Sequence, residues 1–320
     1  ASSDPPTAPA TLTIATTRTM TVTSGELIYN GGLVSGGGTL SLSSLTATLN
    51  VDLSNAGVTL GASGTTFNGP GTLTNVSSQS MTLTSCTVNT LLDNQGSLIA
   101  QGTGAVNGVF ASGAGSSLRI LGSSAASHAT LTVASGFTNN GRLELTSVGG
   151  AFNATLAVTS GTLVNPSGRT ISALVGGGGV RTLAAEVDNQ GTLSIGAALT
   201  LNRASADHVN SGTIDVTGGN LTVNLNGSGS FTNTGNFNIA ATRVATTNSG
   251  TFSHNSGALG GSGGLSFTGG NVANLTAAFS VASLSANSAT VNLTPNYSTT
   301  SALSGANATF NGPGIITNVP

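Results

Sequence analysis

Three carboxylates and one arginine in neighbouring stretches are the first candidates for chemistry in this sequence. Asp188, Asp207 and Asp215 follow one another closely, and Arg203 lies among them. A polysaccharide lyase would use clustered carboxylates to hold calcium and an arginine or lysine as a base. Asp188, however, directly precedes an asparagine of an Asn-x-Gly repeat, as Asp93 does in a stretch without other acids. We therefore expect a structural role for Asp188 and no catalytic residue in this chain.

Three histidines and one cysteine are the remaining groups that could bind a metal or act as nucleophiles. His208 and His254 are 46 residues apart, about two repeats, which would place their rings too far apart for one zinc ion. We expect these two and His128 on the surface or in loops. Cys86 lies in an alternating apolar–polar stretch, which predicts a small core residue. The run Gly176–Gly179 lacks the Lys-Ser/Thr pair of a phosphate loop, so no cofactor is expected.

The composition excludes several classes of protein. The 320 residues include seven basic and nine acidic side chains, for a net charge of −2, and the basic residues do not cluster. Binding to nucleic acid or to an anionic membrane surface needs many positive side chains. No run of about 18 apolar residues is present, so membrane insertion is not expected. Glycine contributes 47 residues, helix formers are rare and 38% of the residues are hydrophobic, which favours an ordered all-β chain.

A repeat based on the tripeptide Asn-x-Gly runs through the chain, with an apolar and a polar residue before it and an alternating stretch after it. Seven asparagines mark its copies, one of which has an extra residue: Asn94, Asn139, Asn165, Asn189, Asn210, Asn233 and Asn248. Their spacings are 45, 26, 24, 21, 23 and 15 residues, so the unit is about 21–26 residues if the first spacing covers two units. This length fits one coil of a parallel β-solenoid.

The residues after each repeat glycine alternate as in a β-strand. Leu193 and Ile195, for example, flank the polar Ser194 after Gly191. Stacked coils would place equivalent positions about 4.8 Å apart, with the apolar ones in columns inside the rod. We expect Asn and Gly at a corner where positive φ angles turn the chain. A half-buried asparagine there would bond to its counterpart in the next coil, so we predict a structural ladder of the seven asparagines.

The remaining sequence predicts one long domain. Residues 1–10 are rich in proline and are expected to form an extended leader, and residues 11–320 a single solenoid. The glycine-rich segments 103–127, 176–179 and 257–270 are expected to leave the rod as loops. Coils of about 22 residues would give about 14 coils and a rod about 70 Å long.

One sequence segment recurs far along the chain and suggests a binding partner for the rod. Residues 66–76 read TFNGPGTLTNV and residues 309–319 read TFNGPGIITNV. Either further coils follow the second copy in a longer chain, or its coil end is open. An open end is a strand edge that accepts another chain, so we predict head-to-tail self-association.

The quoted strings resemble the repeats of bacterial surface β-helix proteins, namely filamentous-haemagglutinin-like adhesins and autotransporter passenger domains. The resemblance covers about residues 60–260 and rests on strings of the form N-x-G-T-[LIF]-x-[ILV]. It implies a right-handed parallel β-helix that is extracellular or on a bacterial cell surface, and it supplies no ligand site. The N-terminal secretion-domain motifs of such families are not seen.

We therefore expect an extracellular structural β-solenoid that acts as a filament-forming, spacer or adhesin segment without catalysis, cofactor or metal. The expected partners are further copies of the chain and a host or surface glycan receptor, and not nucleic acid. The alternative is a carbohydrate-binding or polysaccharide-cleaving β-helix protein. With 4% aromatic residues and no Trp, the sequence has few side chains on which a sugar could stack.

Overall fold

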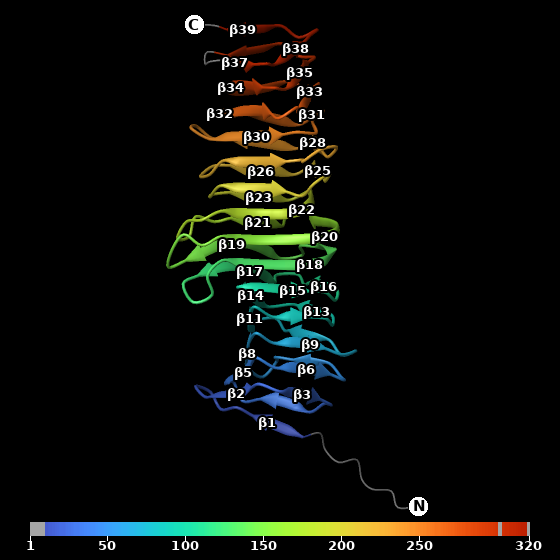
Figure 1. The fold of residues 1–320 in the computed structure, drawn as a ribbon, viewed down its shortest axis with the longest axis vertical. Helices are drawn as coiled ribbons and strands as arrows, with labels where there is room; N and C mark the ends of the chain where they lie inside the picture. The colour runs from blue at the N-terminus through green and yellow to red at the C-terminus, as the bar shows by residue number, and fades with distance from the viewer. Residues whose placement is uncertain (1–9, 300–302, 319–320) are drawn as a thin grey trace, which may run out of the picture.

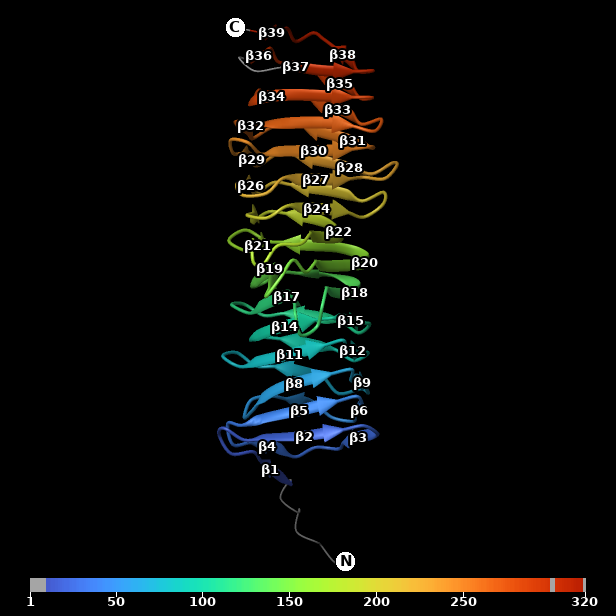
Figure 2. The ribbon, with the colours of Figure 1, turned by 60° about the vertical axis from the view of Figure 1, so that its left-hand side comes forward.

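The computed structural model describes residues 10–299 and 303–318, which form a parallel β-solenoid of about 14 turns. The strands stack along one axis, and the first and last strands lie at opposite ends of the rod (Figure 1). The same stacking is seen after a turn about the long axis (Figure 2). The described residues contain no helix. Accordingly, none of them belongs to a helix that is long and apolar enough to cross a membrane.

Each turn has three sides, distinguished by the strands that stack on one another. The first side carries β2 (Thr19–Thr23), β5 (Thr39–Ser43), β8 (Thr59–Ser63), β11 (Ser80–Thr84), β14 (Ser97–Gln101), β17 (Ser117–Ser123), β19 (Arg142–Val148), β21 (Thr170–Ala173), β23 (Thr192–Ile195), β26 (Thr213–Val216), β29 (Asn236–Ile239), β36 (Tyr297–Thr299) and β39 (Ile316–Asn318). The second side carries β3 (Glu26–Tyr29), β6 (Thr46–Leu49), β9 (Thr66–Asn68), β12 (Thr87–Val88), β15 (Thr103–Val106), β24 (Leu199–Asn202), β27 (Leu221–Asn224), β30 (Val244–Asn248) and β37 (Leu303–Ala306).

The third side carries β1 (Thr11–Thr13), β4 (Leu33–Ser35), β7 (Leu53–Ser54), β10 (Leu73–Asn75), β13 (Leu92–Asn94), β16 (Phe110–Ser112), β25 (Asp207–Asn210), β28 (Ser230–Asn233), β31 (Thr251–His254), β33 (Val272–Leu275), β35 (Thr290–Leu293) and β38 (Thr309–Asn311). Five longer strands bend around a corner and serve two sides: β18 (Ala129–Thr138), β20 (Ala154–Asn165), β22 (Arg181–Asn189), β32 (Ala258–Thr268) and β34 (Phe279–Asn287). The predicted β-solenoid is thus confirmed.

The core is one continuous column of apolar side chains along the rod. Because strand side chains alternate, every second residue points inward, and in-register pairing places it on its counterpart in the next coil. From β14 to β32, one such column on the first side holds only Leu, Ile and Phe: Leu98, Leu118, Leu143, Ile171, Leu193, Ile214, Phe237 and Leu259. On the third side the rings of Phe231 and Phe252 stack at 5.5 Å with an interplanar angle of 5°.

Two of the three predicted loop excursions are wrong. Segment 103–127 contains β15, β16 and β17, because Val106, Phe110 and Leu118 supply core positions. Segment 257–270 is crossed by β32. Its glycines are needed where coils approach closely, since a Cβ on Gly261 would collide with the carbonyl of Ile239. Glycine density therefore marked tight packing in these segments and not a departure from the rod.

The segment 176–179 does lie in a loop between β21 and β22. Its base is held by Arg181, which is fully buried and directed inward from β22. The guanidinium donates to the carbonyls of Phe152, Leu174 and Val175 and to the Ser147 hydroxyl. Burial lowers the pKa of Arg181. The predicted leader falls on residues 1–9, which lie outside the described part of the chain, and on Ala10, whose carbonyl accepts from Leu33.

Candidate functional site

A row of buried side-chain amides runs along the corner that follows the third side. Within each run, every amide but the last donates from Nδ2 to Oδ1 of the asparagine in the next coil, at 2.6–3.0 Å. The longer run contains Asn139, Asn165, Asn189, Asn210 and Asn233, and a shorter run below it contains Asn55, Asn75 and Asn94. All eight are at most 2% exposed, so they are more deeply buried than the half-buried ladder expected from the sequence.

The ladder satisfies nearly every polar atom that it buries. Asn189 is typical: its Oδ1 accepts from Asn165, and its Nδ2 donates both to Asn210 Oδ1 and to the Thr213 carbonyl at 3.0 Å. A buried amide costs little stability when its donors and acceptor are all used. The ladder also fixes the register of each coil on the next, because a slipped coil would leave buried amides without partners.

Asn248 is not in this ladder, and the prediction for it is wrong. It lies half-buried in β30 on the second side, where it pairs with Asn224 of β27. The ladder position above Asn233 is taken by His254, whose Nδ1 lies 3.1 Å from Asn233 Nδ2. The Asn-x-Gly string at Asn248 thus occurs at another corner, which accounts for its spacing of only 15 residues.

Three members of the row were missed in the sequence. Asn55 begins the string Asn-Ala-Gly and carried a usable signal, whereas Asn75 has no glycine two positions later. His254 lies 21 residues after Asn233, which is one full coil, so counting could have found it. Ser112 pairs with Asn94 and interrupts the row, so the spacing of 45 residues to Asn139 does cover two coils.

The repeat glycines form a second column at the same corner, for a reason that differs from the prediction. None of the ladder asparagines has a positive φ, and neither do Gly191, Gly212 and Gly235. A Cβ on Gly212 would instead collide with the carbonyl of Gly191, and a Cβ on Gly235 with that of Gly212. The corner therefore needs glycine because successive backbones touch, and not because the chain turns with positive φ.

The acids singled out in the sequence do not converge. Asp207 lies on the third side in β25, and Asp215 on the first side in β26. Each accepts from a neighbour in the next coil, Ser230 and Asn238 respectively, at 2.6 and 2.8 Å. Arg203 donates to the carbonyls of Thr159 and Gly161.

Asp188 has a local role at the corner, as does Asp93. Gln190 Nε2 donates to Asp188 Oδ2 at 2.7 Å, and Gln95 Nε2 donates to Asp93 Oδ1 at 2.5 Å. Within residues 10–299 and 303–318, no three His, Cys, Asp or Glu side chains gather closely enough to hold a metal ion.

The two acids that do stack are Asp207 and Glu186, and Glu186 was not a candidate from the sequence. They occupy neighbouring coils, and the Asp207 amide donates to Glu186 Oε2 at 3.3 Å. Glu186 also accepts from the Thr162 hydroxyl at 2.7 Å. Hydrogen bonds from both neighbouring coils thus offset the repulsion between stacked carboxylates.

Two of the three histidines are buried, contrary to the prediction. His208 is 1% exposed and occupies the core column between Val187 and Phe231, and its Nδ1 accepts from the Val187 amide at 3.2 Å. His254 is fully buried in the asparagine row, while His128 is exposed. Cys86 is a free, buried core residue as predicted, and burial raises the pKa of its thiol.

Because His208 is buried, we expect the free energy of unfolding to fall on acidification. Burial lowers its pKa from 6.5 to about 4, although Glu186 and Asp207 oppose this shift. The unfolded chain takes up the proton below about pH 6.5 and the folded chain only near pH 4, so stability is lost across this window. We expect a loss of about 3 kcal/mol between pH 7 and pH 4 from this residue alone.

Urea unfolding at both pH values checks this expectation by comparing the wild type with His208→Leu. The leucine keeps an apolar group in the column and cannot take up a proton. The wild type should lose more stability than the variant on acidification by the stated amount. Equal losses in the two proteins would show that His208 is not the group responsible.

One polar hollow on the surface carries positive charge. It has a volume of about 420 Å³ and is lined by Ser116, Ser117, Arg142, Arg169 and Thr170 among others. Arg142 also forms an ion pair with the buried Glu144 at 3.4 Å, and Arg119 forms a second one at 2.7 Å. The hollow therefore offers hydroxyls and a guanidinium to an anionic group.

Comparison with known proteins does not assign the chain to a family. No protein-family model, curated protein or solved structure matches the chain.

Proposed function

We propose that this chain is an extracellular structural rod, a spacer or adhesin segment that keeps what is attached to its ends apart. The observation that carries the proposal is the stack itself: parallel, in-register ladders join each coil to the next along the rod. Bending such a rod would stretch many backbone hydrogen bonds on one side at once. A stiff spacer is what this arrangement does best.

The side chains support a mechanical role. The buried amide row ties each coil to the next with bonds of 2.6–3.0 Å. The outward faces are mostly hydroxyls and amides, and charged residues are only 5% of the chain. Like charges stacked about 4.8 Å apart would repel, so a rod of stacked coils is more stable with few of them.

The proposed location rests on the resemblance of the Asn-x-Gly strings to bacterial surface repeats. An antibody against the chain should label intact cells of the source organism. Labelling that appears only after the cells are broken open would contradict this location.

Single-molecule energy transfer between the two ends tests the rod. Dyes on Thr21→Cys and Ser298→Cys, in a Cys86→Ala background, lie on exposed strand positions near opposite ends. Thirteen coil spacings predict a single narrow distance of about 60 Å. That distance should stay unchanged when salt is varied. A broad or salt-dependent distribution would exclude a stiff spacer.

A glycan receptor is the second candidate partner, favoured by the polar hollow beside Arg142 and Arg169. A glycan array that includes sulfated and uronic-acid polysaccharides tests it. Binding that Arg169→Ala abolishes would assign the hollow to a glycan, and release of reducing ends would instead support the polysaccharide-cleaving alternative. Arg243→Ala is the matched control, because Arg243 lies in a turn on a different part of the rod.

A further inference from the structure

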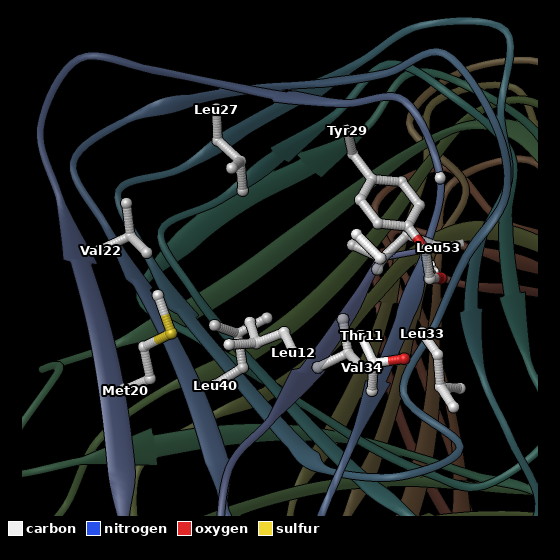
Figure 3. Close-up of a pocket in the computed structure, with 13 residues that line it drawn as sticks. Thr11, Leu12, Met20, Val22, Leu27, Tyr29, Leu33, Val34, Leu40 and Leu53 are labelled. Carbon is white, nitrogen blue, oxygen red and sulfur yellow. Dashed lines mark hydrogen bonds between the residues drawn. The ribbon is translucent and has the colours of Figure 1, made fainter. Parts of the chain in front are cut away.

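The first coil of the rod exposes apolar side chains at its open end. Met20 is 39% exposed, whereas Leu40, Leu60 and Met81, which continue its column in the next coils, are at most 6% exposed. Leu12 and Leu33 of the first coil are 37% and 54% exposed. Figure 3 shows several of them around a hollow that opens at this end. The hollow has a volume of about 280 Å³, and Met20, Val22, Leu27, Tyr29 and Leu40 line it from the inner faces of the first coils. A surface of this kind indicates a docking site.

The last coil repeats, in sequence and in bonding, a coil that lies inside the rod. Residues 303–318 correspond to residues 60–75, and nine of the eleven residues in 66–76 recur in 309–319. The backbone bonds to the coil below also recur: Gly71 donates to Leu49 and Gly314 to Leu293, both at 2.9 Å. Ile315 likewise donates to Asn296 as Thr72 does to Asp52, at 2.9 and 2.8 Å.

The first coil repeats the coil that lies directly on that inner one. Residues 19–24 read TMTVTS and residues 80–85 read SMTLTS. Ser24 and Ser85 both turn with positive φ, at 60° and 51°. The preceding turns also match, because Arg18 donates to Ala15 as Gln79 does to Val76, at 3.0 and 3.1 Å.

The rod therefore contains a template for a contact between its own two ends. In the interior β11 lies on β8, with Met81 over Leu60, and β12 lies on β9, with Val88 over Phe67. Met81 and Leu60 are 0% and 1% exposed, whereas their counterparts at the ends, Met20 and Leu303, are 39% and 36% exposed. The same residue types at the same positions are thus buried inside the rod and uncovered at its ends.

We propose that a second copy of this chain covers the exposed first coil, and that residues 303–318 of one copy stack beneath residues 19–35 of the next in the register of the internal template. This partner deepens the proposed structural function and rests on it. The register places Leu303 under Met20, Thr309 under Glu26 and Phe310 under Leu27. Phe310 thereby meets the hollow that Leu27 lines.

Charge does not oppose this contact. Residues 303–318 contain no charged side chain, and the first coil contributes only Arg18 and Glu26 over residues 10–35. Both ends are therefore free to approach, and burial of the exposed apolar side chains of the first and last coils is the driving force.

The template also fixes the rotation between the copies. Strand β8 lies on the first side, but its counterpart β37 lies on the second. The next copy is therefore rotated about the rod axis by one of the three sides. Stacking without this rotation would place β1 on β38 and β2 on β39 and leave no strand above β37. The residues before β1 do not suit that gap, because Pro5, Pro6 and Pro9 lack the N–H of a ladder position.

One strand must move for the copies to join. β39 of the lower copy and β1 of the upper copy both belong beneath β4, where β1 now pairs Thr13 with Ser35. All three residues of β1 are exposed, whereas Ile316 of β39 is half-buried. We therefore assign the position to β39, so that β1 is displaced when two copies join.

Disulfide trapping of the full-length chain tests the register. In a Cys86→Ala background, Glu26→Cys/Thr309→Cys places two exposed cysteines on directly paired positions of different copies. Paired positions on neighbouring strands are close enough for a disulfide. Mild oxidation should give a ladder of covalent dimers, trimers and longer species on a non-reducing gel. Thr66→Cys/Thr87→Cys, the internal counterpart, should close within one chain and shows that the geometry permits the bond.

Two further pairs test the alternatives. Glu26→Cys/Asn311→Cys is shifted by two residues and should cross-link at least tenfold more slowly. Thr21→Cys/Thr317→Cys places one cysteine on β2 and one on β39, and their disulfide would form between copies only if the copies stacked without the rotation. A monomeric Glu26→Cys/Thr309→Cys protein, or equal rates for the shifted pair, would overturn the proposal, and fast cross-linking of the β2–β39 pair would overturn its register.

Locking β1 tests the displacement. Thr13 and Ser35 are paired, and their hydroxyl oxygens lie 3.5 Å apart, so Thr13→Cys/Ser35→Cys should close a bond within one chain. End-to-end species measured by mass photometry should disappear on oxidation and return on reduction. Association that survives the lock would show that β1 is not displaced. The stacking proposal fails, and the spacer function stands, if none of the cysteine pairs links two copies while the distance between the two dyes on one chain stays narrow.

Discussion

Replacing Asn189 by alanine is expected to destabilise the rod by about 3 kcal/mol, because it breaks a buried hydrogen-bond network from the middle. Asn210 Oδ1 would lose its donor and Asn165 Nδ2 the nearest of its acceptors, and both side chains are buried. Urea unfolding followed by circular dichroism measures the change in the free energy of unfolding.

The control is a solvent-exposed asparagine that makes the same kind of side-chain hydrogen bonds to the neighbouring coils. Asn89 donates to Asn68 Oδ1 at 2.6 Å and accepts from Asn107 at 2.8 Å, but its side chain is exposed. Asn89→Ala should cost less than about 1 kcal/mol, because water takes over both bonds. Hydrogen exchange should show that Asn189→Ala loosens residues 160–215 first. Similar costs for the two variants would mean that burial does not determine the strength of the ladder.

Replacing Gly212 by alanine is expected to destabilise the protein by more than about 2 kcal/mol, although it adds a single methyl group. The new Cβ would collide with the Gly191 carbonyl and with the backbone of Gln190. The corner cannot relax by moving a flexible side chain, because every atom in the way belongs to the backbone of the coil below. The coils would have to separate locally, which would also stretch the Asn189–Asn210 bond of 2.7 Å.

Gly61→Ala is the matched control for this variant. Gly61 lies in β8, does not have a positive φ and has no neighbouring atom within 4 Å of the place that a methyl group would occupy. Its replacement should change the free energy of unfolding by no more than about 0.5 kcal/mol. Thermal and urea unfolding of both variants give the comparison. A Gly212→Ala protein as stable as Gly61→Ala would contradict the close-packed glycine column.

Much of the fold could be predicted from the sequence because it rests on local periodicity. Alternation around Ser194 places Leu193 and Ile195 on one face, and both are buried in the core column. Asn-x-Gly strings spaced by about one coil predicted a stack of coils, and the ladder from Asn139 to Asn233 follows from that stacking. These features need only strand geometry and the in-register repetition that it imposes.

What failed depended on which coil lies above which, and only the three-dimensional stack decides this. Asn248 matches the motif but lies at another corner, whereas His254, without the motif, completes the row. His208 entered the core because its position in the coil points inward, whatever its polarity. Glycines in 257–270 proved to mark backbone contact with a preceding coil and not a loop.

The sequence by itself determined the strand period, the coil length and the low charge, because each is a property of neighbouring residues. The tertiary structure decided which amides meet, which glycines touch a carbonyl and which apolar residues the two ends leave exposed. Those outcomes depend on the register between residues about 20 positions apart, and that register is set by the packing of whole coils on one another.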